Sequence, residues 1–232
     1  MTDNMVVGRE AWIVARKALL EEEKALTHAR EALAAKRRGL PWVKLEKDYQ
    51  FEGEKGPVSL AALFGPHRQL VIQHFMFGPD WEEGCPSCSF MADGYSQQLP
   101  HLAARDVAMV AVSRAPLTKL LAYRKRLGWL FPWVSSLGSD FNVDFQVSFP
   151  KDGNGVEQFY NYEPKIYDSE EMPGISTFYK NDAGEIFHTY STFNRGLDDF
   201  IMAYRFLDIV PRGRDEEGLS DSMDWVKRRD KY

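Results

Sequence analysis

The sequence predicts an α/β fold in which a central mixed sheet is flanked by helices and an N-terminal helical extension precedes it. Apolar segments at 69–77 and 106–113 predict buried strands, and helical patterns at 89–104 and 117–127 follow them in alternation. That order implies a parallel βαβ unit with a right-handed crossover. A later segment, 175–190, alternates polar and apolar residues around a turn and predicts an antiparallel hairpin.

Composition limits the classes of protein that this chain can belong to. At 232 residues with 44% hydrophobic and 13% aromatic residues, it can form one large domain or a domain with an appendage. The net charge of −5 argues against a nucleic-acid partner, which requires a basic face. No stretch approaches the roughly 18 apolar residues of a membrane span, and Met1 to Asn4 do not begin a signal peptide. We therefore expect a cytoplasmic protein without membrane contact.

The first part of the chain is a strong helical pattern at 9–38, which Gly39 and Pro41 end. Its apolar side chains recur every seven residues at Trp12, Leu19, Leu26 and Leu33. This helix could mediate a homodimer or bind another partner. It could equally lie across the surface of its own domain, which is the interpretation we favour, because so few repeats are a weak coiled-coil signal.

Shorter segments complete the prediction. Residues 47–64 predict a hairpin that leads into a single helical turn. Residues 131–135 predict a short strand or an extended approach to the site. An aromatic-rich inserted hairpin follows around a turn at 152–155, and 197–208 predict a closing helix.

The only two cysteines form the motif Cys85-Pro86-Ser87-Cys88, at the junction of the first buried strand and the helix after it. The unpaired N–H groups and the dipole at a helix N-terminus favour a thiolate. Residues three apart on a helix share one face, so the two sulfurs can approach bonding distance. Zinc would need two further ligands, and the five histidines show no paired spacing. We expect redox chemistry with no metal and no cofactor.

The segment from Trp81 to Cys88 resembles the W-A-E-W-C-G-P-C segment of thioredoxins, with the tryptophan four residues before the first cysteine in both. Gly174-Ile175-Ser176-Thr177-Phe178 resembles the G-I-P-T-L segment that faces the dithiol in that fold. The whole chain is similar to a bacterial thioredoxin-like family described as predicted dithiol-disulfide oxidoreductases, with peroxiredoxin-like features. The resemblance implies three parts: an N-terminal helical extension at 1–41, a thioredoxin-like domain at 42–210 and a charged, irregular C-terminal tail at 211–232.

The resemblance also implies roles for individual residues. Cys85 would attack a disulfide of a protein or a small molecule, and Cys88 would resolve the mixed disulfide. The residues expected to contact the substrate are Trp81, Pro86, Ser87 and Ser176. Ser176 occupies the place of the thioredoxin cis-proline, so we expect a trans peptide bond there and a hydroxyl beside the dithiol. Glu82 and Glu83 are expected to raise the pKa of Cys85, which argues against an extremely acidic thiol.

Departures from the family pattern keep two alternatives open. Thioredoxins carry a buried aspartate where this chain has Pro79, and peroxiredoxins carry a hydroxyl residue where it has Glu82. The chain could therefore be a binding module with a non-catalytic dithiol, or a thiol-dependent peroxidase. His74 could tune the site or belong to the core, and Trp133 could form a second wall of the site or pack in the core.

Overall fold

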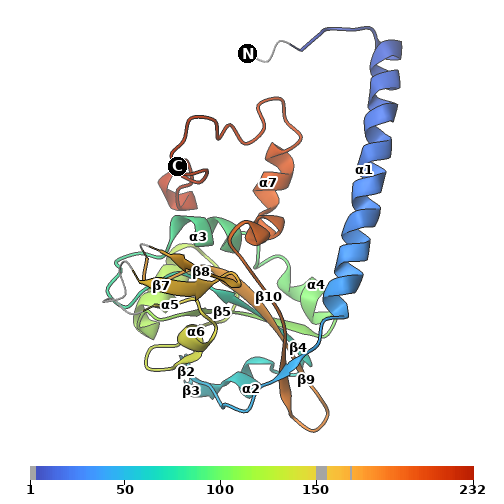
Figure 1. Cartoon of the computed structure of the whole chain (residues 1–232). Helices are drawn as coiled ribbons and strands as arrows, with labels where there is room; N and C mark the ends of the chain where they lie inside the picture. Colours follow the sequence, from blue (N-terminus) through green and yellow to red (C-terminus); the bar gives the residue numbers. More distant parts are fainter. Residues whose placement is uncertain (1–3, 150–155, 168) are drawn as a thin grey trace.

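The computed structural model describes residues 4–149, 156–167 and 169–232, and the centre of this part of the chain is an eight-stranded sheet (Figure 1). The strand order is β1-β10-β9-β4-β5-β6-β2-β3. The strands of this sheet are β1 (Val43–Lys44), β2 (Gln50–Gly53), β3 (Gly56–Ser59), β4 (Gln69–His74), β5 (Val107–Ser113), β6 (Trp133–Ser135), β9 (Gly174–Lys180) and β10 (Ile186–Phe193). A separate two-stranded sheet pairs β7 (Glu157–Tyr160) with β8 (Glu163–Ile166).

The sheet is mixed, as predicted. Strand β4 runs parallel to β5, and β5 runs parallel to β6. Strand β9 pairs antiparallel with β4 on its other side and forms the predicted hairpin with β10. Parallel strands therefore carry the first half of the domain and the hairpin closes it, so the α/β thioredoxin-like arrangement is confirmed.

The helices differ from the prediction in two places. They are α1 (Arg9–Arg38), α2 (Leu60–Leu63), α3 (Pro86–Ala92), α4 (Leu99–Ala103), α5 (Leu117–Arg126), α6 (Phe141–Asp144) and α7 (Met202–Leu207), with the 3₁₀ helices η2 (Asn194–Phe200) and η3 (Arg229–Lys231). A single helix over 89–104 is wrong, because α3 ends at Ala92 and a second helix, α4, begins at Leu99 with Pro100 in its first turn, where proline cannot continue a preceding helix. The closing helix is likewise divided, since Ile201 has an extended backbone between η2 and α7.

The shorter predicted segments are present. The hairpin and helical turn are β2, β3 and α2, the segment at 131–135 contains β6, and the inserted hairpin is β7 with β8. The turn at 152–155 lies outside the described residues. Among the helices that the structure describes, none has the length and apolar character needed to cross a membrane.

Two apolar clusters cover the two faces of the sheet. One packs α3, α5 and α7 against Phe75, Phe77 and Ile175, and it contains Cys88. The other packs α2 and α6 against the opposite face, around Ile72 and Phe178. Trp133 is fully buried in the first cluster and its indole N–H donates to the Ser113 hydroxyl at 3.0 Å. It is therefore a core residue and not a wall of the site.

Helix α1 stands away from the rest of the molecule (Figure 1). None of its residues is buried, so the interpretation that it lies across its own domain is wrong. Only its C-terminal end is held: the Arg37 guanidinium lies 5.5 Å from the Tyr190 ring centre, and Trp42 packs on Tyr179 at 5.1 Å. Among the residues that the structure describes, none buries the apolar stripe.

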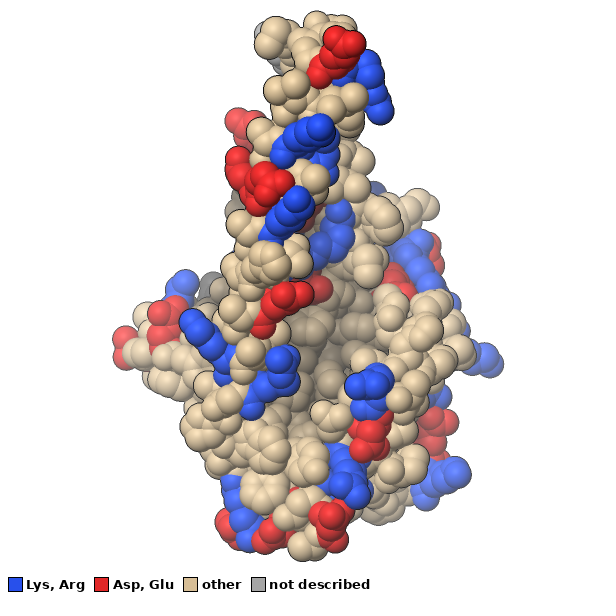
Figure 2. Space-filling model, turned by 90° about the vertical axis from the view of Figure 1, so that its right-hand side faces the viewer, with Lys and Arg blue, Asp and Glu red and all other residues tan. Residues whose placement is uncertain are grey.

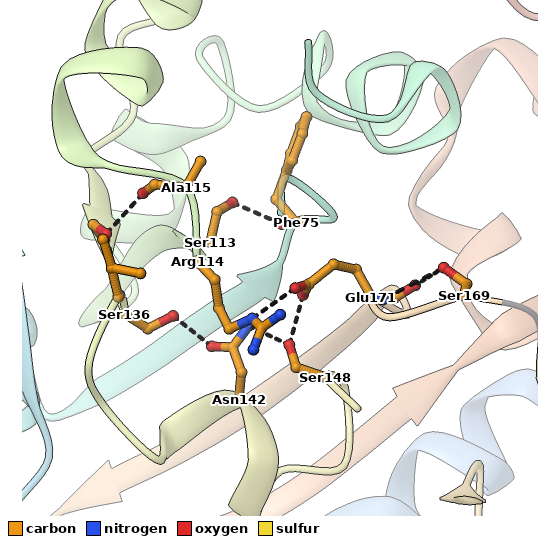
Figure 3. Close-up of polar contacts among 11 residues, drawn as sticks. Phe75, Ser113, Arg114, Ala115, Ser136, Asn142, Ser148, Ser169 and Glu171 are labelled. Carbon is orange, nitrogen blue, oxygen red and sulfur yellow. Dashed lines mark hydrogen bonds and ion pairs between the residues drawn. The ribbon is translucent and has the colours of Figure 1, made fainter. Parts of the chain in front are cut away.

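A buried polar network ties together the loops that follow β5 and β6 (Figure 3). The Arg114 Nε donates to Glu171 at 2.6 Å, and the Ser148 hydroxyl donates to the other Glu171 oxygen at 2.5 Å. Asn142 extends the chain from Ser148 to Ser136. Burial raises the pKa of Glu171, and the bonds from Ser148 and Arg114 oppose that shift. These loops lie at the C-terminal end of the parallel strands, the same end at which the chain leaves β4 for α3.

We expect Glu171→Ala to lower the free energy of unfolding by about 2–3 kcal/mol, because it leaves Arg114 and Ser148 without their buried acceptor. Arg114 keeps some contact with solvent, which limits the loss. The exposed Glu163→Ala is the matched control and should change stability by less than about 0.5 kcal/mol. Urea denaturation measures both, and equal effects would show that the network adds no stability.

Candidate active site

Helix α3 starts at the cysteine motif, where a backbone hydrogen bond ties the chain back to the residues that directly follow β4. The Cys85 N–H donates to the Met76 carbonyl at 3.0 Å, and Cys85 is the N-cap of the helix. Pro86 occupies the first turn, where its missing N–H leaves no bond unmade. The Cys85 sulfur accepts the Cys88 N–H at 3.5 Å. The first cysteine thus caps the helix and the second lies one turn inside it.

The two thiols have opposite environments. Cys85 is partly exposed and Cys88 is buried, as predicted. Hydrogen bonding from the Cys88 side chain, with smaller contributions from the N–H groups of Cys88 and Ser87, lowers the pKa of Cys85 to about 7 against the opposing effect of burial. The bond to Cys85 and burial raise the pKa of Cys88 well above its ordinary value. Near neutral pH the thiolate therefore forms on Cys85.

The expected opposition of Glu82 and Glu83 to the thiolate is wrong. Glu82 is exposed, and Glu83 is paired with Arg126 at 2.6 Å and Arg228 at 2.8 Å. The bond from Arg126 lowers the pKa of Glu83, so the carboxylate is ionised but neutralised by two guanidinium groups. The pKa of Cys85 is lowered, chiefly by the hydrogen bond from the Cys88 side chain and less by the N–H groups at the helix start, rather than raised by the acidic loop.

The C-terminal segment holds the residue before Cys85. Arg228 donates to the Gly84 carbonyl from Nη2 at 2.7 Å and from Nε at 3.1 Å. It also donates to the Tyr123 hydroxyl at 2.9 Å, which is bonded in turn to Ser89 in α3. Gly84 is required here because a Cβ would lie 2.7 Å from the Phe75 ring. Sequence reasoning missed Arg228, since no local spacing links residues so far apart.

A cavity of about 280 Å³ opens beside the dithiol. Cys85, Ser87 and Cys88 line one side, and Met76 and Met91 add apolar surface. The opposite side is formed by η2 and by the C-terminal residues 221–223. The C-terminal segment passes close to α3 (Figure 1), where Trp225 packs edge-on against Phe90 at 5.4 Å. The dithiol therefore lies on the wall of a cavity that is partly open to solvent.

Ser176 does not lie in this cavity. Its hydroxyl is fully buried and bonds to His74 and to Ser191, each at 2.7 Å. The register of β9 explains why Ser176 is not in the cavity. Ser176 pairs with Ile72, in the middle of β4, whereas Gly174 pairs with His74, the last residue of β4 before the dithiol. Pro173 lines the cavity in its place. The Ile175–Ser176 peptide bond is trans, as predicted, since the described residues contain no cis bond.

The other predicted site residues divide between the cavity and the core. Ser87 lines the cavity, whereas Pro86 does not, and Trp81 packs over Gly78 and does not line it either. His74 lies on the sheet face away from the dithiol, where it stacks on Phe141 at 5.5 Å and burial lowers its pKa to about 3. It is a core residue. Within the described ranges, no three histidine, cysteine or acidic side chains gather as a metal site.

The sequence matches, over residues 1–232, the family described as "Bacterial protein of unknown function (DUF899)". The chain belongs to this family. No curated protein matches its sequence. Among solved structures, peroxidoxin BcpB from Mycobacterium tuberculosis is 13% identical with a TM-score of 0.46, covering 69% of this chain and 93% of that one. Peroxiredoxin Q from Xanthomonas campestris is 16% identical with a TM-score of 0.46, covering 72% and 96%.

The pKa difference between the thiols predicts how this family member reacts with iodoacetamide. Labelling of Cys85 should accelerate as pH rises and reach half its maximal rate near pH 7, because only the thiolate attacks. Cys88 should stay unlabelled in the folded protein, since it is buried and protonated. Peptide mapping after timed labelling checks both. Faster labelling of Cys88 would contradict the assignment.

Arg228→Gln should destabilise the protein by about 1.5–3 kcal/mol, because it removes charged hydrogen bonds to Gly84. It should also move the Cys85 labelling midpoint to higher pH, since Glu83 loses one of its two guanidinium partners. The neighbouring, exposed Lys227→Gln is the control and should change neither quantity. An unchanged midpoint in Arg228→Gln would limit Arg228 to a structural role.

Proposed function

We propose that this protein is a thiol-disulfide oxidoreductase whose redox centre is the pair Cys85 and Cys88. The observation that carries the proposal is the geometry of the two thiols: Cys85 is a partly exposed helix cap whose sulfur accepts the Cys88 N–H at 3.5 Å, and Cys88 is buried one turn away. This arrangement supplies a nucleophile at neutral pH and holds the second thiol in reserve.

The reaction proceeds in two exchanges. The Cys85 thiolate attacks one sulfur of a substrate disulfide, so that a mixed disulfide forms and one thiolate leaves. Cys88 then loses its proton to that leaving thiolate and attacks the Cys85 sulfur, which releases the second substrate sulfur as a thiolate that takes its proton from solvent. The substrate gains two electrons and two protons, and the protein is left with a Cys85–Cys88 disulfide. A dithiol or two small thiols must return the electrons.

The cavity favours a small-molecule disulfide over an extended polypeptide. Its volume is about 280 Å³, and residues of η2 and of the C-terminal segment line it together with the dithiol. Met76 and Met91 offer apolar contact, while Arg195 and Asp198 form a 2.9 Å ion pair at its lining. A compact substrate with apolar and polar parts fits such a space.

The site does not favour a peroxidase. Glu82 stands three residues before Cys85, in the position of the peroxiredoxin hydroxyl residue, and it is exposed and absent from the cavity lining. Hydrogen peroxide should therefore oxidise Cys85 no faster than it oxidises an ordinary thiolate of the same pKa. A binding module with an inert dithiol is distinguished by the exchange experiment that follows.

Cys85→Ser should abolish reduction of bis(2-hydroxyethyl) disulfide, because the nucleophile is lost. Cys88→Ser should accumulate a stable mixed disulfide with one hydroxyethylthio group, because nothing resolves it. Intact-mass spectrometry under non-reducing conditions measures both, and each variant serves as the other's control. If neither the wild type nor Cys88→Ser forms an adduct, the dithiol is inert and the proposal fails.

A further inference from the structure

Helix α1 presents a long apolar stripe that no other described residue of its own chain covers. Trp12, Leu19, Leu26 and Leu33 are each about half exposed, and an alanine directly precedes every one of them. A helix of this length spans about 45 Å. Soluble proteins rarely expose an apolar surface of that extent unless another surface covers it. The stripe therefore calls for a partner.

A groove lies at the base of the same helix. It encloses about 440 Å³ and is lined by sheet residues that include Val71, Tyr179 and Tyr190, and by Arg37 and Arg38 of α1. Figure 2 shows this face of the molecule with a hollow beside the base of α1. Arg37 follows Leu33 by one turn, so it shares the face of the stripe. Its contact with Tyr190 shows that this face continues into the groove.

We propose that a second copy of the chain covers both features, through an antiparallel pairing of the two α1 helices. In this symmetric dimer, the C-terminal halves of the two α1 helices lie along one another, and the N-terminal half of each extends into the other copy's groove. The exposed apolar residues of that half, Trp12, Ile13 and Leu19, suit the apolar lining. One surface of the chain thus complements another surface of the same chain, which a closed two-fold dimer requires.

Charge specifies the register of this pairing. Glu21, Glu22 and Glu23 lie near the middle of α1, and Lys36, Arg37 and Arg38 lie at its end beside the groove. The antiparallel register that places Glu22 opposite Arg37 also places Leu26 opposite Leu33. By symmetry the dimer then has two such contacts, each between the acidic centre of one helix and the basic end of the other. A parallel pairing would instead place like charges opposite one another.

The first test is the mass of the intact protein by size-exclusion chromatography with light scattering. We expect two 26.7-kDa chains. The double variant Leu19→Glu with Leu26→Glu should run as a monomer. The control, Lys17→Glu with His28→Glu, adds two glutamates on the opposite face of the helix and should remain a dimer. The circular dichroism spectrum and the rate of Cys85 labelling should be the same in the wild type and both double variants. A monomeric variant that meets this condition has lost its dimer contact without misfolding, and the result does not depend on the redox proposal.

The second test uses charge exchange. Glu22→Lys with Glu23→Lys and, separately, Lys36→Glu with Arg37→Glu should each be monomeric, because like charges then meet in the homodimer. Mixing the two variants should restore a dimer that contains one of each, since both contacts regain opposite charges. A monomeric wild type, a dimer that survives the Leu19 and Leu26 changes, or a mixture that stays monomeric would each overturn the proposal.

Discussion

The hydrogen bond from the Cys85 amide to the Met76 carbonyl is the contact on which the site depends. It fixes the start of α3 against the segment that follows β4, so that the N-cap of the helix is Cys85 and not the residue before or after it. A shift of one residue would move the cap away from Cys85 and turn Cys88 to a different face of the helix. The contrast between a partly exposed thiolate and a buried thiol follows from that single register.

The surroundings of the dithiol come from distant parts of the chain. The loop before Cys85 is held by Arg228 of the C-terminal segment, and the same arginine helps to neutralise Glu83. Residues 221–223 of that segment also line the cavity. One segment thus links the geometry around Cys85, its electrostatic environment and the size of the cavity beside the dithiol. The network around Glu171 holds the adjoining loops in place.

The local sequence was enough to predict the mixed sheet, the hairpin and the dithiol. Apolar runs indicate buried strands, turn residues indicate a hairpin, and the C-P-S-C motif stands directly before a helical pattern. The end of α3 at Ala92 and the start of α4 at Leu99 are boundaries that an apolar pattern conceals. Ser176 was misplaced because a sequence resemblance does not fix strand register, and the strand reaches the dithiol end at Pro173 instead. Arg228 and the exposure of α1 depend on tertiary contacts, which no local pattern encodes.

The central claim is that Cys85 and Cys88 form one reversible two-electron couple. Equilibrating the protein with glutathione buffers of graded potential, followed by acid quenching, alkylation and intact-mass measurement, tests it most directly. The account predicts a single transition from two alkyl groups to none, with the same midpoint when approached from the oxidised or the reduced protein. A dithiol that keeps both alkyl groups at every potential, or a protein that reaches only one glutathione adduct, would contradict it.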